Sequence, residues 1–390
     1  MNRLNKTLFS LVAPVVTAGG VYGGVAGAEL VDETGLLDES RLAAVYALAK
    51  KHDLGHLIAG ALRAQGVAMP SGKLGAELER AEMTAVYRVR NNENEQGRVK
   101  RCLEDAGIPF ILLKGAVTRG YYPEAWMRTS SDIDILVPRD KLDAVVEAIT
   151  SGLDYEISTI EAHDASLYAR SGVHLDVHTL FEGDGEGCEN LTRTWASART
   201  EGGMERFMTA EDFYLYHVAH MAKHMKNGGC GIRPFIDLYL IRKMTKRDEA
   251  TVAELLQSLV IDRFERAAVA LADAWMTGGD TSGLSALEEY VLTGGVYGST
   301  DQYVAARHRG RHSKLGYIMR RIFMPYAQLK ERHPVLVKHP ILTPVMQVWR
   351  WLSVLDPARL KRTGRELVSN ARVDSEKITS VEELFVSLGI

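Results

Sequence analysis

The sequence contains only three cysteines, Cys102, Cys188 and Cys230, and no two of them lie close together. Secreted domains that depend on disulfides need an even, closely spaced set of cysteines, and a CxxC metal-binding pair is missing as well. The sequence therefore argues against a disulfide scaffold and favours reduced thiols and a cytoplasmic location.

An excess of basic residues is also missing. The chain has 47 Lys and Arg against 50 Asp and Glu, which gives a net charge of −3 at pH 7. Proteins that hold nucleic acid or an anionic membrane across a broad surface carry a basic surplus. We therefore expect no membrane partner and disfavour an RNA acceptor, although a local basic patch could still bind a polyanion.

One long uncharged run, "TLFSLVAPVVTAGGVYGGVAGA", covers residues 7–28. Arg3 and Lys6 precede it and a small-residue triplet ends it, as in a secretion signal. Pro14 and four glycines, however, are unsuited to one continuous membrane-spanning helix. We favour a short first helix that ends near Ala18 and a glycine-rich loop after it, and a targeting segment is the alternative.

Hydrophobic periodicity predicts helices at both ends of the chain and a mixed α/β segment between them. Helical patterns cover residues 29–66, 74–106 and 139–152 and return after residue 200, whereas strand patterns cover 110–113, 133–137, 154–159 and 172–181. The expected fold class is α+β, a small mixed-sheet core flanked by N-terminal and C-terminal helical regions. The expected division is an N-terminal helical region (1–95), an α/β core (96–200), a helical domain (201–300) and a C-terminal helical region (301–390).

Two aspartates one residue apart begin the strand in "RTSSDIDILVPRD", residues 128–140. Alternate side chains share a face of a strand, so Asp132 and Asp134 point one way while Ile133 and Ile135 point the other. Two like charges on one face repel each other unless a cation lies between them. Since carboxylate oxygens are hard ligands, this pair predicts a Mg²⁺ or Mn²⁺ site.

Two further segments supply the other parts that phosphate chemistry needs. Asp176 lies in the alternating segment "HLDVH", so it reaches the same face if the two strands are neighbours. The strand that ends in "LLKG" leads into a turn at Gly115, whose backbone N–H groups can hold a phosphate beside the charge of Lys114. In such a site Asp132 and Asp134 hold a nucleotide-bound metal, and Asp176 binds the metal that activates an acceptor hydroxyl and could take its proton.

These stretches together resemble the polymerase-β-like nucleotidyltransferase superfamily. Its pattern is an apolar strand, a glycine turn, a strand with paired aspartates and a later strand with one acidic residue, matched here by "GIPFILLKGAV", "YYPEAWMRTSSDIDILV" and "HLDVHTLF". With "HMAKH" and "GIRPFIDLYLI" downstream, the chain is similar, more narrowly, to the bacterial nucleotidyltransferase family proteins of uncharacterised substrate. The resemblance implies a nucleotidyltransferase core with helical flanking domains, Mg²⁺ dependence, and transfer of a nucleoside monophosphate from an NTP such as ATP with release of pyrophosphate.

The chain departs from this superfamily at the phosphate turn. Where the superfamily usually has Gly-Ser or Gly-Gly, this chain has Gly115-Ala116, so no serine hydroxyl is available there. We expect Lys114, Arg128 or Ser131 to make the phosphate contacts instead, although Arg128 could also be the ion partner of the aspartates.

Two nearby side chains have a supporting role in this hypothesis. His178 shares a strand face with Asp176, where it either orients a catalytic carboxylate or has a purely structural role. Arg233 and Asp237 lie one helical turn apart, and we expect them to form an ion pair.

Three histidines, His217, His220 and His224, form one stripe of a predicted helix, with Cys230 beyond it. This pattern permits a zinc site, but the acidic partner of an HExxH arrangement is missing. We favour a helix face that packs against the core or lines the cleft.

Two other functions fit part of the pattern. A glycosyltransferase can also hold a metal and a nucleotide sugar through two aspartates, but it would need an α/β nucleotide-binding half before them, where this chain is helical. A non-catalytic nucleotide-binding module is the second alternative. The acceptor stays open among a small molecule, a peptide or protein side chain, and a tRNA end.

Overall fold

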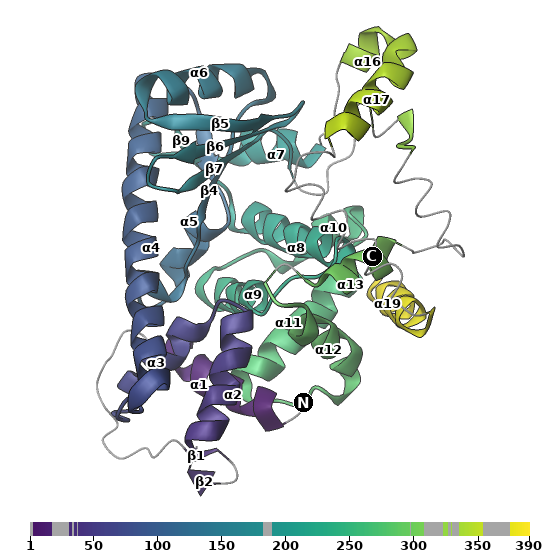
Figure 1. Cartoon of the computed structure of the whole chain (residues 1–390). Helices are drawn as coiled ribbons and strands as arrows, with labels where there is room; N and C mark the ends of the chain where they lie inside the picture. The colour runs from purple at the N-terminus through teal and green to yellow at the C-terminus, as the bar shows by residue number, and fades with distance from the viewer. Residues whose placement is uncertain are drawn as a thin grey trace.

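The computed structural model has a seven-stranded mixed sheet with helical regions on either side of it (Figure 1). This arrangement confirms the α+β class with flanking helices. The structure describes residues 3–17, 31–32, 35–36, 38–181, 189–296, 298–307, 323–326, 329, 335–353 and 375–390. Cys188 and the glycine-rich segment after the first helix lie outside the described residues.

The N-terminal run forms a short helix, α1 (Arg3–Thr17), as we favoured. Its apolar side chains belong to the main core, where the Phe9 ring stacks on Trp275 with centroids 4.5 Å apart. No described helix is both long and apolar enough to cross a membrane. The apolar residues of α1 are therefore explained by packing within the protein, and the rest of the run lies outside the described residues.

The predicted helical stretch 29–66 is divided into several elements. Two-residue strands β1 (Val31–Asp32) and β2 (Gly35–Leu36) pair first, and helices α2 (Glu39–Lys51) and α3 (Gly55–Ala64) follow. Asp38 caps α2, because its side chain accepts a hydrogen bond from the Arg41 N–H at 2.8 Å. Asp53 separates the two helices with a positive φ of 54°. The helical prediction, with its cap at Asp38, is therefore confirmed over α2 and α3 and is wrong at β1 and β2.

Helix α4 (Gly72–Asp105) has 34 residues, so it is about 50 Å long. In Figure 1 it runs along one side of the molecule, from the N-terminal helices to the sheet. Its first half packs against α3, and its last turns, with Val99 and Leu103, lie in the core beneath the sheet. One helix thus fixes the N-terminal region relative to the α/β core.

The sheet has the strand order β5-β6-β7-β4-β3-β9-β8. Pairing is parallel between β4 and β7 and between β3 and β9, and antiparallel elsewhere. The strands are β3 (Phe110–Leu112), β4 (Asp132–Leu136), β5 (Tyr155–Ile160), β6 (Asp164–Ala169), β7 (His174–His178), β8 (Arg199–Thr200) and β9 (Glu205–Phe207). The sequence patterns predicted four of these strands and missed β6, β8 and β9.

The two faces of the central strands have different neighbours. Ile133, Ile135 and Val137 pack into a core that α4 and α6 (Leu142–Gly152) cover. Asp132 and Asp134 lie on the opposite face, towards the helices that follow the sheet. The alternation seen in the sequence is therefore a true division between a buried apolar face and a polar face.

The helices after the sheet share one apolar cluster with α1 and α3. The remaining α-helices are α5 (Gly115–Thr118), α7 (Glu189–Ser197), α8 (Ala210–Lys226), α9 (Arg233–Met244), α10 (Glu249–Ser258), α11 (Asp262–Thr277), α12 (Ser285–Gly294), α13 (Thr300–Arg307), α16 (Val335–Lys338), α17 (Thr343–Ser353) and α19 (Ser375–Leu388), and short 3₁₀ turns lie at 119–121, 125–127, 139–141, 282–284 and 340–342. Because this cluster also includes Ile111 and Leu113, the helices are packed directly against the polar side of the sheet.

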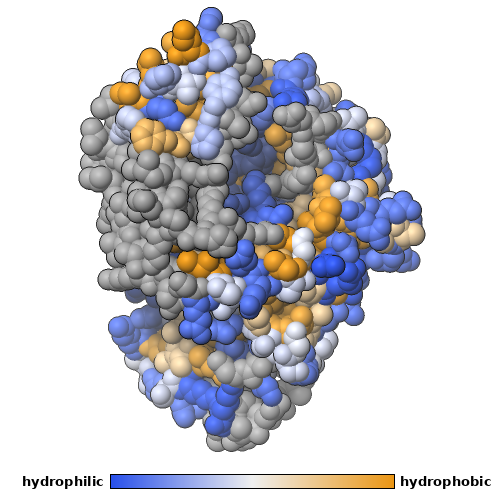
Figure 2. Space-filling view, turned by 90° about the vertical axis from the view of Figure 1, so that its right-hand side faces the viewer, coloured by the Kyte–Doolittle hydropathy of each residue, from blue (hydrophilic) through white to orange (hydrophobic). Residues whose placement is uncertain are grey.

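Apolar side chains of α17 and the turn before it are exposed. Ile341 is 86% exposed and Trp349 is 64% exposed. Figure 2 shows apolar residues at the top of the molecule, where α16 and α17 lie. A small separate cluster that includes Met324 and Leu336 holds this part of the chain, so α17 contributes little to the main core.

Two glycines of α4 test how closely this helix packs. A Cβ on Gly75 would lie 1.9 Å from the Pro70 carbonyl oxygen, whereas a Cβ on Gly97 would meet only the Arg101 side chain at 3.5 Å. We expect Gly97→Ala to raise the free energy of unfolding by about 0.5–1 kcal/mol through helix propensity, and Gly75→Ala to lower it by about 1–3 kcal/mol through overpacking. Urea unfolding measures both, and shifts of the same sign would contradict this account of the packing.

Candidate active site

The parallel pairing of β4 with β7 brings three carboxylates together. Asp134 lies directly opposite Asp176 in the register, and Asp132 lies two residues earlier on the same face of β4. One ligand oxygen from each of the three aspartates lies within 4.8 Å of the others. The neighbouring strands that the sequence required are therefore present, and the three acidic groups form one cluster.

Two cationic groups contact the most buried member of this cluster. Asp134 is 2% exposed, and its carboxylate accepts hydrogen bonds from Lys114 Nζ and from His178 Nε2, the latter at 3.1 Å. His178 Nδ1 lies 2.7 Å from a carboxylate oxygen of Asp164. With both ring nitrogens facing carboxylates, His178 donates two hydrogen bonds as an imidazolium.

The pKa values of these groups follow from the contacts. Burial alone would lower the pKa of His178, but the hydrogen bonds to Asp134 and Asp164 raise it to about 9. Burial alone would raise the pKa of Asp134, but the positive charge of Lys114 and the hydrogen bond from His178 hold it well below its usual value. Asp134 is therefore ionised at neutral pH although it is buried.

Hydroxyl groups hold the other two carboxylates. Ser130 Oγ donates to Asp132 Oδ1, and Ser166 Oγ donates to Asp176 Oδ1, each at 2.5 Å. Sequence reasoning missed both serines. Ser166 could not be found without the strand β6, and Ser130 precedes Asp132 by two residues, which is the only local signal it offers.

The turn between β3 and α5 approaches the cluster closely. Lys114 has φ 46° and ψ −124°, a conformation that is sparsely populated by residues other than glycine. A Cβ on Gly115 would lie 2.9 Å from Ser130 Oγ, so only glycine fits at this position. The turn thus places the Lys114 ammonium on Asp134 and leaves the backbone of Gly115 beside the acidic residues.

A cleft of 690 Å³ lies between the sheet and the following helices. Its sheet side includes Lys114, Gly115, Arg128, Ser131, Asp132, Asp134 and Asp176, and its helical side includes His220, His224, Cys230 and Arg233. Every residue that the sequence nominated for catalysis or nucleotide binding therefore lines one cavity. His178 supports this cavity through its hydrogen bond to Asp134.

Arg128 is buried and makes an ion pair with Asp237. Its Nε lies 2.9 Å from both oxygens of that carboxylate, which also accepts a hydrogen bond from the Tyr122 hydroxyl at 2.8 Å. Burial alone would lower the pKa of Arg128, but Asp237 raises it well above its usual value. The direct ion partner of Arg128 is therefore Asp237, with Asp132 contributing only a weaker charge interaction, while the contact of Arg128 with phosphate stays a prediction.

Arg233 has a different partner from the one the sequence suggested. Its Nη2 pairs with Asp53 of the α2–α3 turn, and its Nη1 donates to the Thr129 carbonyl at 3.0 Å. The expected pair between Arg233 and Asp237 was wrong, because each residue binds across the cleft wall to a segment far away in the chain.

Of the three histidines in the stripe, His220 and His224 line the cleft and His217 does not. His217 is buried with Nε2 2.9 Å from the Pro234 carbonyl oxygen, and the Nε2 atoms of His220 and His224 lie 2.9 Å apart. Among the described residues, three His, Cys, Asp or Glu ligand atoms converge only at the three aspartates. The interpretation as a helix face at the cleft agrees with these positions.

The sequence model of a family described as uncharacterised nucleotidyltransferase matches residues 38–277, which include the sheet, the three aspartates and helices α2 to α11. No curated protein matches the sequence.

The ion pair between Arg128 and Asp237 ties the sheet to α9, and its removal tests that role. We expect Asp237→Asn to lower the free energy of unfolding by about 3–5 kcal/mol, because a buried guanidinium is left uncompensated. Asp273→Asn is the matched control. Asp273 pairs with Arg242 and its side chain is 41% exposed. We therefore expect Asp273→Asn to lower the free energy of unfolding by about 1 kcal/mol or less. Equal effects of the two changes in urea unfolding would contradict the structural role.

Proposed function

We propose, because the chain belongs to the family of uncharacterised nucleotidyltransferases, that it transfers a nucleoside monophosphate from an NTP to an acceptor in a metal-dependent reaction. The observation that carries this proposal is the cluster of Asp132, Asp134 and Asp176 on the wall of the 690 Å³ cleft. A cavity of that volume is of the size that holds a nucleotide-sized ligand.

The donor set fits a hard divalent cation. Asp132, Asp134 and Asp176 offer only carboxylate oxygens, which suit Mg²⁺ or Mn²⁺ rather than a soft metal. When bound there, such cations offset the charge of the triphosphate and orient the attacking and leaving oxygens. The three carboxylates carry more negative charge than Lys114 and His178 carry positive charge. The site therefore has a net negative charge that attracts a cation.

The residues of the chain then have separate tasks. The acceptor oxygen forms a bond to the α-phosphorus, the bond from that phosphorus to pyrophosphate breaks, and the acceptor proton passes to Asp176. Lys114, the Gly115 backbone and Ser131 contact the phosphates from the β3–α5 turn and the start of β4. Arg128, held by Asp237, adds positive charge to the same wall of the cleft.

The structure also bears on the two alternatives. A glycosyltransferase would need an α/β nucleotide-binding half before the paired aspartates, and residues 39–105 form helices α2, α3 and α4 instead. A non-catalytic module has no need of a third carboxylate opposite Asp134, yet β7 provides one. Both observations favour the transferase.

Transfer of label from an NTP tests the reaction itself. The protein is incubated with Mg²⁺, each of the four NTPs labelled at the α-phosphate, and a cell extract as the source of acceptors. We expect pyrophosphate release and labelled product. We expect Asp132→Asn and Asp176→Asn each to reduce the rate by more than about 100-fold, because the loss of a residue that only supports a metal ligand already costs about 10–100-fold and these residues are the ligands themselves.

Asp140→Asn is the control for these variants, since Asp140 is exposed and lies outside the cleft. Circular dichroism checks that each variant is folded. Turnover of nucleotide sugars alone would favour the glycosyltransferase, and NTP binding without turnover would favour the module. Full activity in Asp132→Asn would refute the site.

Metal binding is measurable without any substrate. We expect Mn²⁺ to raise the melting temperature, because a ligand at about 100 times its Kd adds about 2.7 kcal/mol to the free energy of unfolding. Asp132→Asn should lose most of this shift and Asp140→Asn should keep it. An equal shift in the wild type and Asp132→Asn would show that the metal binds elsewhere.

A further inference from the structure

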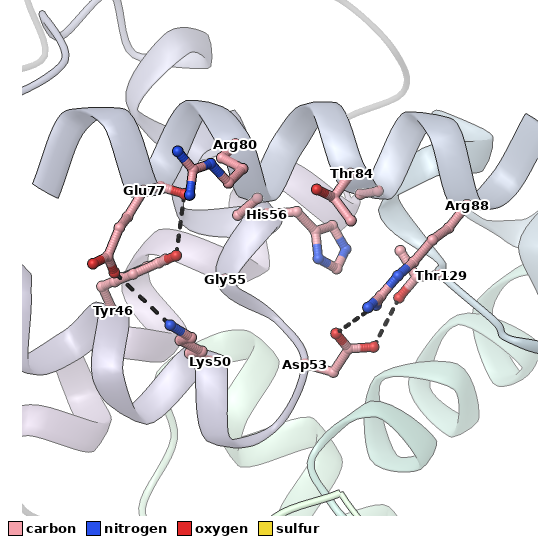
Figure 3. A pocket seen from close by; sticks show the side chains of 12 residues that line it. Tyr46, Lys50, Asp53, Gly55, His56, Glu77, Arg80, Thr84, Arg88 and Thr129 are labelled. Carbon is pink, nitrogen blue, oxygen red and sulfur yellow. Dashed lines mark hydrogen bonds and ion pairs between the residues drawn. The ribbon is translucent and has the colours of Figure 1, made fainter. Parts of the chain in front are cut away.

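A second pocket, of 320 Å³, lies between helices α2, α3 and α4 (Figure 3). Asp53, Arg88 and Thr129 line both this pocket and the cleft that holds the aspartate cluster. Figure 3 shows the Asp53 carboxylate in contact with both Arg88 and Thr129 at one end of the pocket. The two cavities therefore adjoin at Asp53, and a ligand that extends past Asp53 along α4 would reach both.

Small residues create the floor of this pocket. Gly55 on α3 and Ala81 and Ala85 on α4 line it, and a Cβ on Gly55 would lie 3.0 Å from the Tyr46 ring. His56 adds no charge to the floor at neutral pH, because burial lowers its pKa to about 4. The charge of the pocket is thus set by the residues on its rim.

The rim has more positive than negative charge. Lys50 and Glu77 form an ion pair at 3.8 Å, so their charges offset each other. Figure 3 marks this pair with a dashed line. Asp53 is shared by Arg88, at 3.3 Å, and by Arg233 from α9, so one carboxylate serves two guanidinium groups. Arg80 is exposed and forms no ion pair with any residue in the described part of the chain. Of the three cations that line the pocket, Arg80 is therefore left without a counter-ion among the described residues, and Arg88 has only a shared one.

The cationic groups follow one face of α4. Arg80, Thr84 and Arg88 are spaced four residues apart, so they lie in one row, about 6 Å from one position to the next. Asn91, less than one turn beyond Arg88, already lines the cleft. This row leads from the second pocket towards the three aspartates over a distance of about 15 Å along the helix.

We propose that the second pocket binds the phosphate-bearing end of the acceptor, a small molecule whose hydroxyl group reaches the aspartate cluster. The assignment rests on the proposed function. Figure 3 shows Arg80 and Arg88 at opposite ends of the pocket with Thr84 between them. Their donors along the pocket can be met by the several oxygens of a phosphate or pyrophosphate group, and a single carboxylate would satisfy fewer of them. The distance along α4 requires an elongated molecule with its phosphate about 15 Å from the reacting hydroxyl.

The pocket can be tested apart from the reaction by binding of inorganic pyrophosphate. The titration is done by calorimetry in EDTA, so that no divalent cation is bound at the aspartates and their net negative charge repels pyrophosphate from the cleft. We expect Arg80→Gln to weaken binding at least tenfold. Arg90→Gln is the matched control, because Arg90 lies on the same helix, pairs with Glu93 and does not line the pocket. Unchanged binding in Arg80→Gln, or citrate binding as tightly as pyrophosphate, would overturn the proposal.

The acceptor is tested by transfer of label to the small molecules of a cell extract. We expect prior phosphatase treatment of the extract, with the phosphatase then removed, to abolish the labelled product. We expect Arg80→Gln to raise the extract concentration needed for half-maximal rate at least tenfold, while Arg90→Gln leaves it unchanged.

The outcomes of the two tests separate the pocket from the reaction. Labelled product that survives phosphatase treatment, or label found in RNA or protein, would overturn the acceptor assignment and leave the transferase standing. Arg80-dependent pyrophosphate binding by a wild-type protein that turns over no NTP would refute the proposed function, and the acceptor assignment would fall with it.

Discussion

The parallel register between β4 and β7 is the constraint on which the site depends. It sets Asp134 opposite Asp176, and a shift by one residue would turn Asp176 to the apolar face. Carboxylates within 4.8 Å of each other repel by about 3 kcal/mol or more per pair at an effective dielectric of about 20. The apolar core on the other face therefore holds together charges that would otherwise separate.

The walls of the cleft are held by ion pairs between distant segments. Arg128 before β4 binds Asp237 on α9, and Arg233 on α9 binds Asp53 in the α2–α3 turn. Together with α4, which spans the N-terminal helices and the sheet, these contacts fix three parts of the chain around one cavity. The same Asp53 borders the second pocket, so the rigidity of the cleft wall and the shape of that pocket have a common origin.

Local patterns in the sequence predicted the parts of the structure that local forces determine. The alternation around Asp132 and Asp134 and in "HLDVH" gave the correct strand faces, because alternation is a property of each strand alone. Strand β6 and its Ser166 were missed, since short strands form through their neighbours. The partners of Arg128 and Arg233 lie 109 and 180 residues away, and such pairs leave no periodic signal in the sequence.

Lys114 shows how the fold and the site make opposing demands. Its backbone conformation is one that glycine adopts freely, and in another residue it costs about 1–3 kcal/mol. A glycine there would relieve the strain but would leave the buried carboxylate of Asp134 without its ammonium partner, which costs more when the charge is enclosed. At the next position, Gly115, a side chain would have to displace Ser130, which fills the space of a Cβ. The turn therefore keeps a lysine where backbone energetics alone favours glycine, and the charge of the cluster accounts for that choice.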